Sequence, residues 1–383
     1  MPYIVNRLYP TPTQVSIFDI LDNVGDTEVH NRHITNGATM TRFVENINPS
    51  VLEKVNIHDL VAKLKEFNIK YEKLFQADRK SLYREFHIPK KSGGLRKIDA
   101  PNDELKEALR ELVTLFVVTF GALYHTSAYA YVSGRCTVDA VKRHQANASK
   151  WFLKTDFSNF FGSTTLEFTM RMLSMIFPFS EVASLPDGKE NLEKALSLGF
   201  LDGGLPQGTP LSPMLTNLIS IPIDHRLAQY FSDRHMVYTR YADDILVSSQ
   251  VNFRFTEVVA YINKVVREEF GAPWFIKPQK TRYGSSAGKN WNLGVMLNKD
   301  NEITIGHAKK KQFKAMIHNY LTDYKRGIQW DLTDVQTFQG LMSYYLMIER
   351  PYIMHIIIEA NKKHGVNLAR VLKADLGGRH SAA

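Results

Sequence analysis

The 383-residue sequence contains a single cysteine, Cys136. One cysteine excludes an intramolecular disulfide framework and a cysteine-rich zinc site, and it suits a reducing compartment. Long hydrophobic runs are also missing, because the longest, Leu112 to Leu123, has 12 residues whereas a bilayer span needs about 20. No positively charged and then apolar leader opens the chain. We therefore expect a soluble, cytoplasmic protein with no membrane partner.

An excess of acidic residues is missing as well. The chain carries 48 Lys and Arg against 39 Asp and Glu, a formal charge of +9. Residues 271–383 hold 17 basic and 8 acidic side chains, so the remaining 31 of each cancel and the whole excess lies in the final part. A basic region favours a polyanionic partner, because Lys and Arg release the counterions condensed on phosphates. A solvated, solubilising surface is the alternative.

Apolar residues are plentiful, at 44% of the chain with 22 Phe and 17 Tyr, which excludes a disordered or collagen-like chain. Residues 1–48 are polar and poorly periodic, and they read as an N-terminal extension. Beyond them, apolar spacing and turn residues predict helices and a hairpin. These are a helix opened by Asn48-Pro49 and running to Phe67, a hairpin over 82–98, and helices over 102–123 and 138–148.

The centre of the sequence mixes strand and helix patterns. The expected elements are a buried strand at 151–156, a helix at 164–177, a loop at 178–191, a long helix over 210–231 kinked at Pro222, a hairpin at 236–249, and short strands at 293–297 and 302–305. From His307 the basic tail is expected to be helical to its end. Helices, a mixed centre and further helices predict the α+β class rather than a doubly wound parallel sheet.

Two acidic motifs end predicted strands. Asp156 closes the strand at 151–156, and Asp243 and Asp244 lie at the tip of the predicted hairpin. Carboxylates gathered at one sheet edge repel one another, and a pair of Mg²⁺ ions resolves the repulsion because Mg²⁺ prefers oxygen ligands. Two such ions, about 3.5–4 Å apart, serve in-line phosphoryl transfer. Taken alone, Asp-Asp at a turn is also ordinary turn chemistry.

From about Phe86 to Tyr352 the sequence resembles the reverse transcriptases in a series of motifs. Tyr241-Ala242-Asp243-Asp244 matches their Tyr-x-Asp-Asp signature. The others are the hairpin 88–98 with its Lys-Lys-Ser-Gly-Gly-Leu-Arg core, and the segments 156–161, 204–213, 279–282 and 293–295. One tetrapeptide is a weak signal, whereas six motifs in order and spacing are a strong one.

This resemblance implies a right-hand polymerase with fingers, a palm containing an antiparallel sheet, and a helical thumb. It places the fingers at 49–150, the palm at 151–300 with an insertion near 178–200, and the thumb at 301–383. It further implies that Asp156, Asp243 and Asp244 hold two Mg²⁺ ions while a primer hydroxyl attacks a deoxynucleotide. Tyr241 and Ala242 should lie under the primer end.

The same resemblance implies contacts to the incoming nucleotide. Lys90, Lys91 and Arg96 of the first hairpin supply cationic donors for a triphosphate, with a solvated basic hairpin as the alternative. Gln207 offers a donor and an acceptor for sugar or base edges, with a loop glutamine facing water as the alternative. Beside it, Gly208 lets the backbone approach a substrate that a side chain would block.

Phe161 matches by position the family's aromatic steric gate, which implies synthesis of DNA rather than RNA. A plain core phenylalanine is the alternative, and the adjacent Phe160 is assigned to the same substrate site. Lys280 is a candidate to protonate the pyrophosphate leaving group, provided that its pKa is lowered toward neutrality; a surface lysine is the alternative. For His144, a solvated helix face is favoured over contact with nucleic acid.

The basic tail predicts a thumb helix that lies along a duplex backbone. Contacts to phosphate of this kind position a duplex without reading its sequence. The residues concerned are Lys309, Lys310, Lys311 and Lys314, with Phe313 and Ile317 turned toward the core.

No RNase H-sized, integrase or Cys/His-rich endonuclease segment follows the thumb motifs, so the resemblance narrows to bacterial retron-like and defence-associated reverse transcriptases. Two elements depart from the usual retron pattern, because 147–151 lacks a His and 292–294 reads Asn-Leu-Gly instead of Val-Thr-Gly. The resemblance implies anti-phage defence and, as partners, an RNA template that includes a structured non-coding RNA, dNTPs and the DNA product. A partner protein or a second copy stays open. Untemplated or protein-primed synthesis, and a non-catalytic RNA-binding scaffold, are the alternatives.

Overall fold

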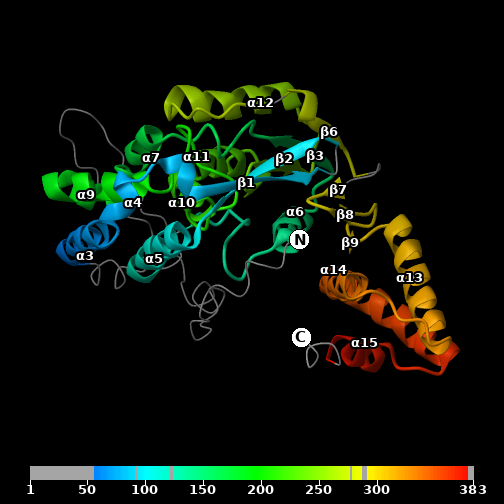
Figure 1. The fold of residues 1–383 in the computed structure, drawn as a ribbon. Helices are drawn as coiled ribbons and strands as arrows, with labels where there is room; N and C mark the ends of the chain where they lie inside the picture. The colour runs from blue at the N-terminus through cyan, green and yellow to red at the C-terminus, as the bar shows by residue number, and fades with distance from the viewer. Residues whose placement is uncertain (1–55, 91–92, 121–123, 277, 287–290, 378–383) are drawn as a thin grey trace. The chain divides into compact units, whose positions relative to one another are not determined.

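A computed structural model describes residues 56–90, 93–120, 124–276, 278–286 and 291–377 (Figure 1). The predicted extension 1–48, the helix opening at Asn48-Pro49 and the side chain of Lys91 lie outside these residues. None of the helices in the described ranges combines the length and the apolar character that a membrane span requires.

Four antiparallel strands form the central sheet in the order β4-β5-β3-β6. They are β3 (Trp151–Asp156), β4 (Met236–Tyr241), β5 (Asp244–Ser249) and β6 (Arg282–Ser285). The predicted strand and the predicted hairpin are confirmed. β6 was not expected, because Arg-Tyr-Gly-Ser has neither apolar alternation nor length, and pairing with β3 decides its conformation.

The main hydrophobic core unites this sheet with the helices beside it. Trp274 is fully buried at its centre, where it contacts the rings of Phe157, Phe160 and Phe168. Its indole N–H donates to Thr164 Oγ1 at 2.9 Å, so the one polar atom of the ring is satisfied. The helices that contribute to this core include α3 (Ile57–Lys70), α4 (Glu72–Gln76), α5 (Asp103–Phe120), α7 (Leu166–Leu173), α10 (Leu211–Ile219), α11 (Ile221–Ser232) and α12 (Phe255–Asn263).

The segment after α7 corrects one prediction. Residues 178–191 were expected to form a loop, but α8 (Phe179–Ser184) and α9 (Pro186–Ser197) occupy most of them. Pro186 stands at the start of α9, where its missing N–H costs nothing. Gly188 packs so closely that a Cβ there would lie 2.2 Å from the Val182 carbonyl oxygen, and α9 packs against α3. Tertiary packing thus overrides a polar, Pro- and Gly-containing sequence.

The long helix expected at 210–231 is two helices. α10 ends at Ile219 and α11 begins at Ile221, with Ser220 between them and Pro222 in the first turn of α11. Proline lacks the N–H that would continue the helical ladder, so the chain restarts instead of bending.

The predicted fingers hairpin is present as β1 (Tyr83–Pro89) and β2 (Leu95–Pro101), preceded by the short turn η2 (Arg79–Leu82). Phe86 pairs with Ile98, and Ile88 with Arg96. The helix expected at 138–148 is α6 (Thr137–Ala146).

The C-terminal part is built from a small sheet and three helices. β7 (Trp291–Asn292), β8 (Val295–Leu297) and β9 (Ile303–Thr304) pair in order. The basic tail is helical as predicted, but interrupted, as α13 (His307–Lys325), α14 (Leu332–His364) and α15 (Leu368–Gly377). α14 kinks at Glu349, two residues before Pro351, which has no N–H to give to the preceding turn.

Candidate active site

The three predicted metal-binding aspartates meet at one end of the central sheet. Asp156, the last residue of β3, pairs in register with Asp244, the first residue of β5. Asp243 lies in the turn before β5, and its carbonyl oxygen accepts a hydrogen bond from the Phe157 amide at 3.0 Å. Antiparallel pairing therefore brings together carboxylates that lie far apart along the chain.

Burial and mutual repulsion disfavour negative charge at this point. Burial, with the charges of Asp243 and Asp156, raises the pKa of Asp244 to about 6, and burial also raises the pKa of Asp243. Asp156 Oδ1 is buried without a hydrogen-bond partner, while Oδ2 accepts from Lys280. Repelling oxygen donors, one of them unpaired, fit a divalent cation. In the described ranges, no three His, Cys, Asp or Glu side chains are placed to hold a metal ion as they stand.

The metal-free protein is expected to be destabilised by Asp244. Its pKa of about 6 in the folded state exceeds the ordinary 3.8, so the free energy of unfolding falls as pH rises through this interval. Asp244→Asn should raise that free energy at about pH 7.5 by about 1 kcal/mol, a figure reduced from the ~3 kcal/mol of the full shift because the side chain is partly solvated. Urea unfolding in EDTA measures the gain, which should shrink near pH 4. An equal gain at both pH values, or the same gain from Asp233→Asn outside the site, would contradict this explanation.

Lys280 and Lys154 flank the carboxylates, and their surroundings shift their pKa values in opposite directions. Lys280 ends the short turn η4 (Pro278–Lys280), and its hydrogen bond to Asp156 raises its pKa, the opposite of the lowering that its predicted acid role requires. Lys154 lies two residues before Asp156 on β3. Burial and the neighbouring Arg282 lower the pKa of Lys154 to about 8.

A buried ion pair, which the sequence pattern did not reveal, supports the Tyr-x-Asp-Asp turn. Arg240 of β4 donates to both carboxylate oxygens of Asp224 in α11 at 2.7–3.1 Å, and the two side chains are 1% and 0% exposed. Arg240 Nη1 also donates to the Ala242 carbonyl oxygen and to Asn217 Oδ1, each at 3.2 Å. Ala242 has φ 57°, a left-handed conformation that costs a non-glycine residue about 1–2 kcal/mol. An arginine in an otherwise uncharged strand was the available signal.

His144 is fully buried, which corrects the expected solvated helix face. Its Nδ1 lies 2.6 Å from Ser248 Oγ and its Nε2 lies 2.8 Å from Thr239 Oγ1, so the ring bridges β5 and β4. Burial lowers the pKa of His144 to about 3, which keeps the ring neutral. The histidine therefore stabilises the hairpin that carries Asp243 and Asp244.

The two adjacent phenylalanines have different environments. Phe160 is 3% exposed and packs against Phe157 and Trp274, so it is a core residue, which corrects its assignment to the substrate site. Phe161 is half-buried, and its ring meets that of Tyr131 edge-on at 6.5 Å between centroids. The charge of Asp243 contributes to the raised pKa of Tyr131, although burial is the larger cause. The Phe161–Tyr131 pair thus lies beside the carboxylates.

Phe161→Ala is expected to increase ribonucleotide incorporation relative to deoxynucleotide incorporation by about tenfold, because removing a ring opens the space that a 2′-hydroxyl needs. Single-nucleotide incorporation with matched rNTP and dNTP measures the ratio. Tyr131→Phe keeps an aromatic ring at the neighbouring position and serves as the control. If the ratio stays unchanged in Phe161→Ala, the residue is not a steric gate.

The turn that carries Gln207 and Gly208 packs against the fingers hairpin. The Gln207 carbonyl oxygen accepts a hydrogen bond from the Asp99 amide at 2.8 Å. Gly208 has φ 120°, and a Cβ there would lie 2.8 Å from Ile98 Cγ2, so only glycine fits. Arg96 of the hairpin lowers the pKa of Asp243 against the larger effect of burial, which places this cation toward the carboxylates. Lys90 is exposed.

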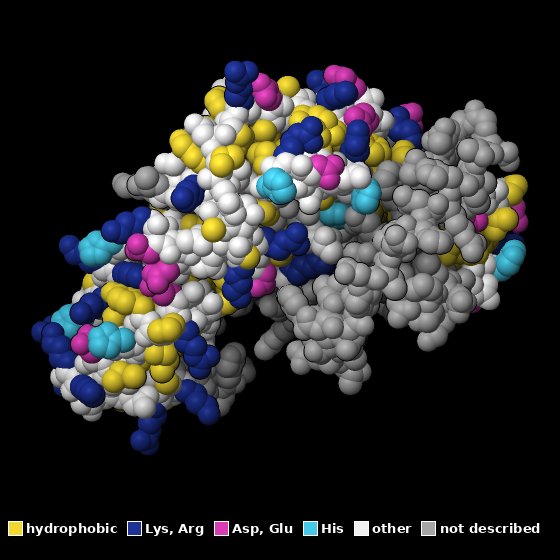
Figure 2. Space-filling view, turned by 180° about the vertical axis from the view of Figure 1, so that it is seen from behind, with side chains coloured by type: hydrophobic (Ala, Val, Ile, Leu, Met, Phe, Trp, Pro, Cys, Tyr) yellow, Lys and Arg dark blue, Asp and Glu magenta, His cyan; other side chains and the backbone are white. Residues whose placement is uncertain are grey.

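The predicted thumb lysines differ in their exposure and in the partners that their ammonium groups contact. Lys310 is paired with Glu349 and lies over the Tyr352 ring, and Lys309 donates to the Gly294 carbonyl oxygen at 2.9 Å. Lys311 and Lys314 are exposed, and Lys314 forms an exposed ion pair with Glu359 at 3.8 Å. Phe313 and Ile317 are buried as expected. Figure 2 shows Lys and Arg side chains on the surface formed by α13, α14 and α15.

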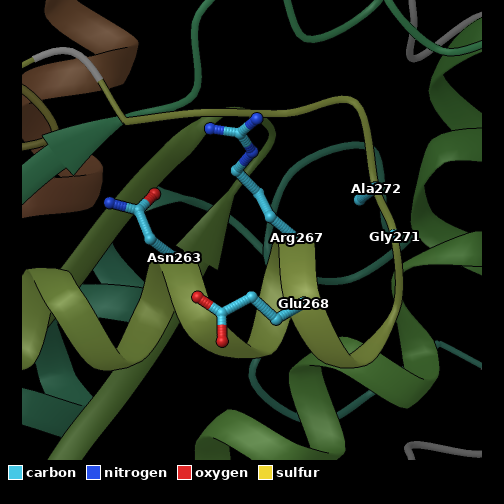
Figure 3. Close-up of a pocket in the computed structure, with 5 residues that line it drawn as sticks. All are labelled: Asn263, Arg267, Glu268, Gly271 and Ala272. Atoms are coloured by element: carbon cyan, nitrogen blue, oxygen red, sulfur yellow. The ribbon is translucent and has the colours of Figure 1, made fainter.

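The hollows in the described part of the chain include the following two. One of about 260 Å³ lies at the carboxylates and is lined by Lys154, Asp156, Asp244, Lys280 and Arg282, among others. The other, of about 560 Å³, lies at α12 and the following π-helical turn η3 (Lys264–Glu269). Asn263, Arg267 and Glu268 project from that helix beside the loop at Gly271 and Ala272 (Figure 3). This second hollow is lined by none of the predicted site residues.

The family described as "Reverse transcriptase (RNA-dependent DNA polymerase)" matches residues 88–319, more than half of the chain. The chain therefore belongs to the reverse transcriptases. The protein is therefore an RNA-directed DNA polymerase with the mixed α+β right-hand fold, and reverse transcriptases generally use divalent metal ions.

The curated relatives are bacterial retron enzymes. The Retron Ec83 reverse transcriptase of Escherichia coli is 24% identical over 323 residues, covering 82% of this chain and 97% of the relative. The Retron Ec73 enzyme of Escherichia coli is 26% identical, covering 73% and 86%, and the Retron Mx162 enzyme of Myxococcus xanthus is 28% identical, covering 68% and 56%. Among solved structures, telomerase from Candida albicans is 12% identical with a TM-score of 0.43, covering 77% of this chain and 61% of the telomerase.

Proposed function

We propose that Asp156, Asp243 and Asp244 hold two Mg²⁺ ions, which are the divalent cations for RNA-directed DNA synthesis. The in-register pairing of Asp156 with Asp244 is the observation that carries the proposal. When bound, the ions would supply charge stabilisation for in-line displacement of pyrophosphate. The unpaired Asp156 Oδ1 and the raised pKa of Asp244 support a cation at this point.

The chain's own residues then orient the reactants. Arg96, with Lys90 beside the hairpin turn, neutralises the triphosphate, and Phe161 occupies the space next to the sugar. Tyr241 and Ala242 lie under the primer end. The Lys280 ammonium, held at Asp156, is placed to offset negative charge on the leaving pyrophosphate.

We assign the fingers to 49–150, the palm to 151–300 and the thumb to 301–383, with exposed Lys311 and Lys314 facing a duplex backbone. The similarity to retron enzymes supports a structured non-coding RNA as template and a role in anti-phage defence. Sequencing the nucleic acid that co-purifies with the full chain, together with extension products made on a defined RNA and dNTPs, tests this proposal. Products complementary to a bound structured RNA are expected. Products unrelated to any RNA would instead favour untemplated or protein-primed synthesis.

A further inference from the structure

Two cations face each other on the central sheet beside the carboxylates. Lys154 of β3 and Arg282 of β6 are direct partners in the antiparallel register. Like charges directly opposite on a sheet are destabilising. In the described ranges neither side chain has a carboxylate partner, and Lys154 is partly buried. The fold therefore tolerates a repulsive pair at this position.

Both cations line the 260 Å³ pocket that also contains Asp156, Asp244 and Lys280. Lys280 is paired with Asp156, so its positive charge is already balanced. In the described ranges no ion pair joins Lys154 or Arg282 to a carboxylate, so these two side chains make one wall of the pocket cationic. An anion with several oxygens satisfies both, because Arg presents a planar fork and Lys a compact charge.

The position of this wall indicates which anion fits. Two residues of strand separate Lys154 from Asp156, about 6.6 Å. That length is close to the axial rise of about two nucleotides in one duplex strand. A phosphate of a strand that ends at the carboxylates, or a released pyrophosphate, falls within this reach.

We propose that Lys154 and Arg282 form a phosphate-binding subsite of the active site. The proposal rests on the proposed function, which places a growing strand and pyrophosphate at these carboxylates. Occupancy of the subsite offsets the repulsion between the two cations, and it holds the strand end or the leaving group in position.

The test uses the full chain with Lys154→Met, Arg282→Gln and the double variant. Lys189→Met, at an exposed position on α9, is the matched control. Fluorescence anisotropy with an RNA–DNA hybrid over a series of salt concentrations measures binding of a strand phosphate. Thermal shift with inorganic pyrophosphate measures binding of the leaving group.

If a strand phosphate occupies the subsite, Lys154→Met weakens hybrid binding by about tenfold and reduces the slope of log affinity against log salt by about one. If pyrophosphate occupies it, the hybrid data stay unchanged and the thermal shift by pyrophosphate is lost. Wild-type values for both ligands in the double variant, or equal losses in Lys189→Met, overturn the subsite. Failure of the wild-type protein to extend a primer overturns the proposed function instead, because both binding measurements are independent of synthesis.

Discussion

Asp156→Asn and Asp243→Asn are each expected to abolish nucleotide incorporation, with a loss of at least about 10³-fold. Each change removes a charged oxygen donor from a point where the described structure gathers three carboxylates and leaves Asp156 Oδ1 unpaired. Asparagine keeps the size and part of the hydrogen bonding of aspartate, so the fold should persist. Primer extension on an RNA template with Mg²⁺ and dNTPs measures the loss.

RNA binding by both variants should stay close to that of the wild-type protein, because removing negative charge takes nothing from a phosphate interface. Asp202→Asn, at an exposed aspartate that pairs with Lys80, is the control and should keep full activity. Substantial synthesis by either active-site variant would show that the carboxylates are not the metal ligands of this polymerase.

A second large effect is expected from removing the buried Arg240–Asp224 ion pair, which supports the Tyr-x-Asp-Asp turn. Asp224→Asn with Arg240→Met removes both charges at once, while the introduced asparagine side chain would still accept the hydrogen bond that Tyr238 gives to Asp224 at 2.8 Å. The donor to the Ala242 carbonyl oxygen is lost, and Ala242 is held in a left-handed conformation. We expect kcat to fall by about 10²-fold with KM nearly unchanged, because a misplaced turn shifts the reacting groups without removing a substrate contact.

Both charges are removed together because a single change would leave the other charge buried and alone, and the protein would unfold for that reason. Circular dichroism should confirm that the double variant is folded. The exposed pair Arg226 and Glu269 lies on the same helix and the neighbouring turn, with N and O 3.0 Å apart, and its removal should leave kcat unchanged. If the double variant is folded and keeps the wild-type kcat, the Arg240–Asp224 pair stabilises the fold and does not position the catalytic turn.

The sequence predicted the features that depend on local pattern. The strand ending in Asp156 is a short apolar run, and the two hairpins join strand-forming residues across a turn. All three are confirmed. The proximity of the aspartates followed from the same patterns, because strands of one sheet can end at a common edge. Their catalytic role remains a prediction.

The features that were missed depend on long-range contacts. β6 forms because β3 offers it a pairing edge, and α9 forms because α3 packs against it. His144 lies in a polar stretch, yet hydroxyls contributed by two distant strands allow it to be buried. Phe160 and Phe161 are adjacent in sequence, and only the position of Trp274 decides which of them enters the core. The raised pKa of Lys280 likewise depends on a carboxylate more than a hundred residues away in the chain.

Binding of Mn²⁺, observed by electron paramagnetic resonance in the presence of a dNTP, tests the central claim most directly, because it reports on the metal without requiring synthesis. The wild-type chain is predicted to bind Mn²⁺ in a dNTP-dependent manner, and Asp156→Asn and Asp243→Asn are each predicted to lose most of this binding. Unchanged Mn²⁺ binding in both variants would contradict the assignment of the metal site to these aspartates.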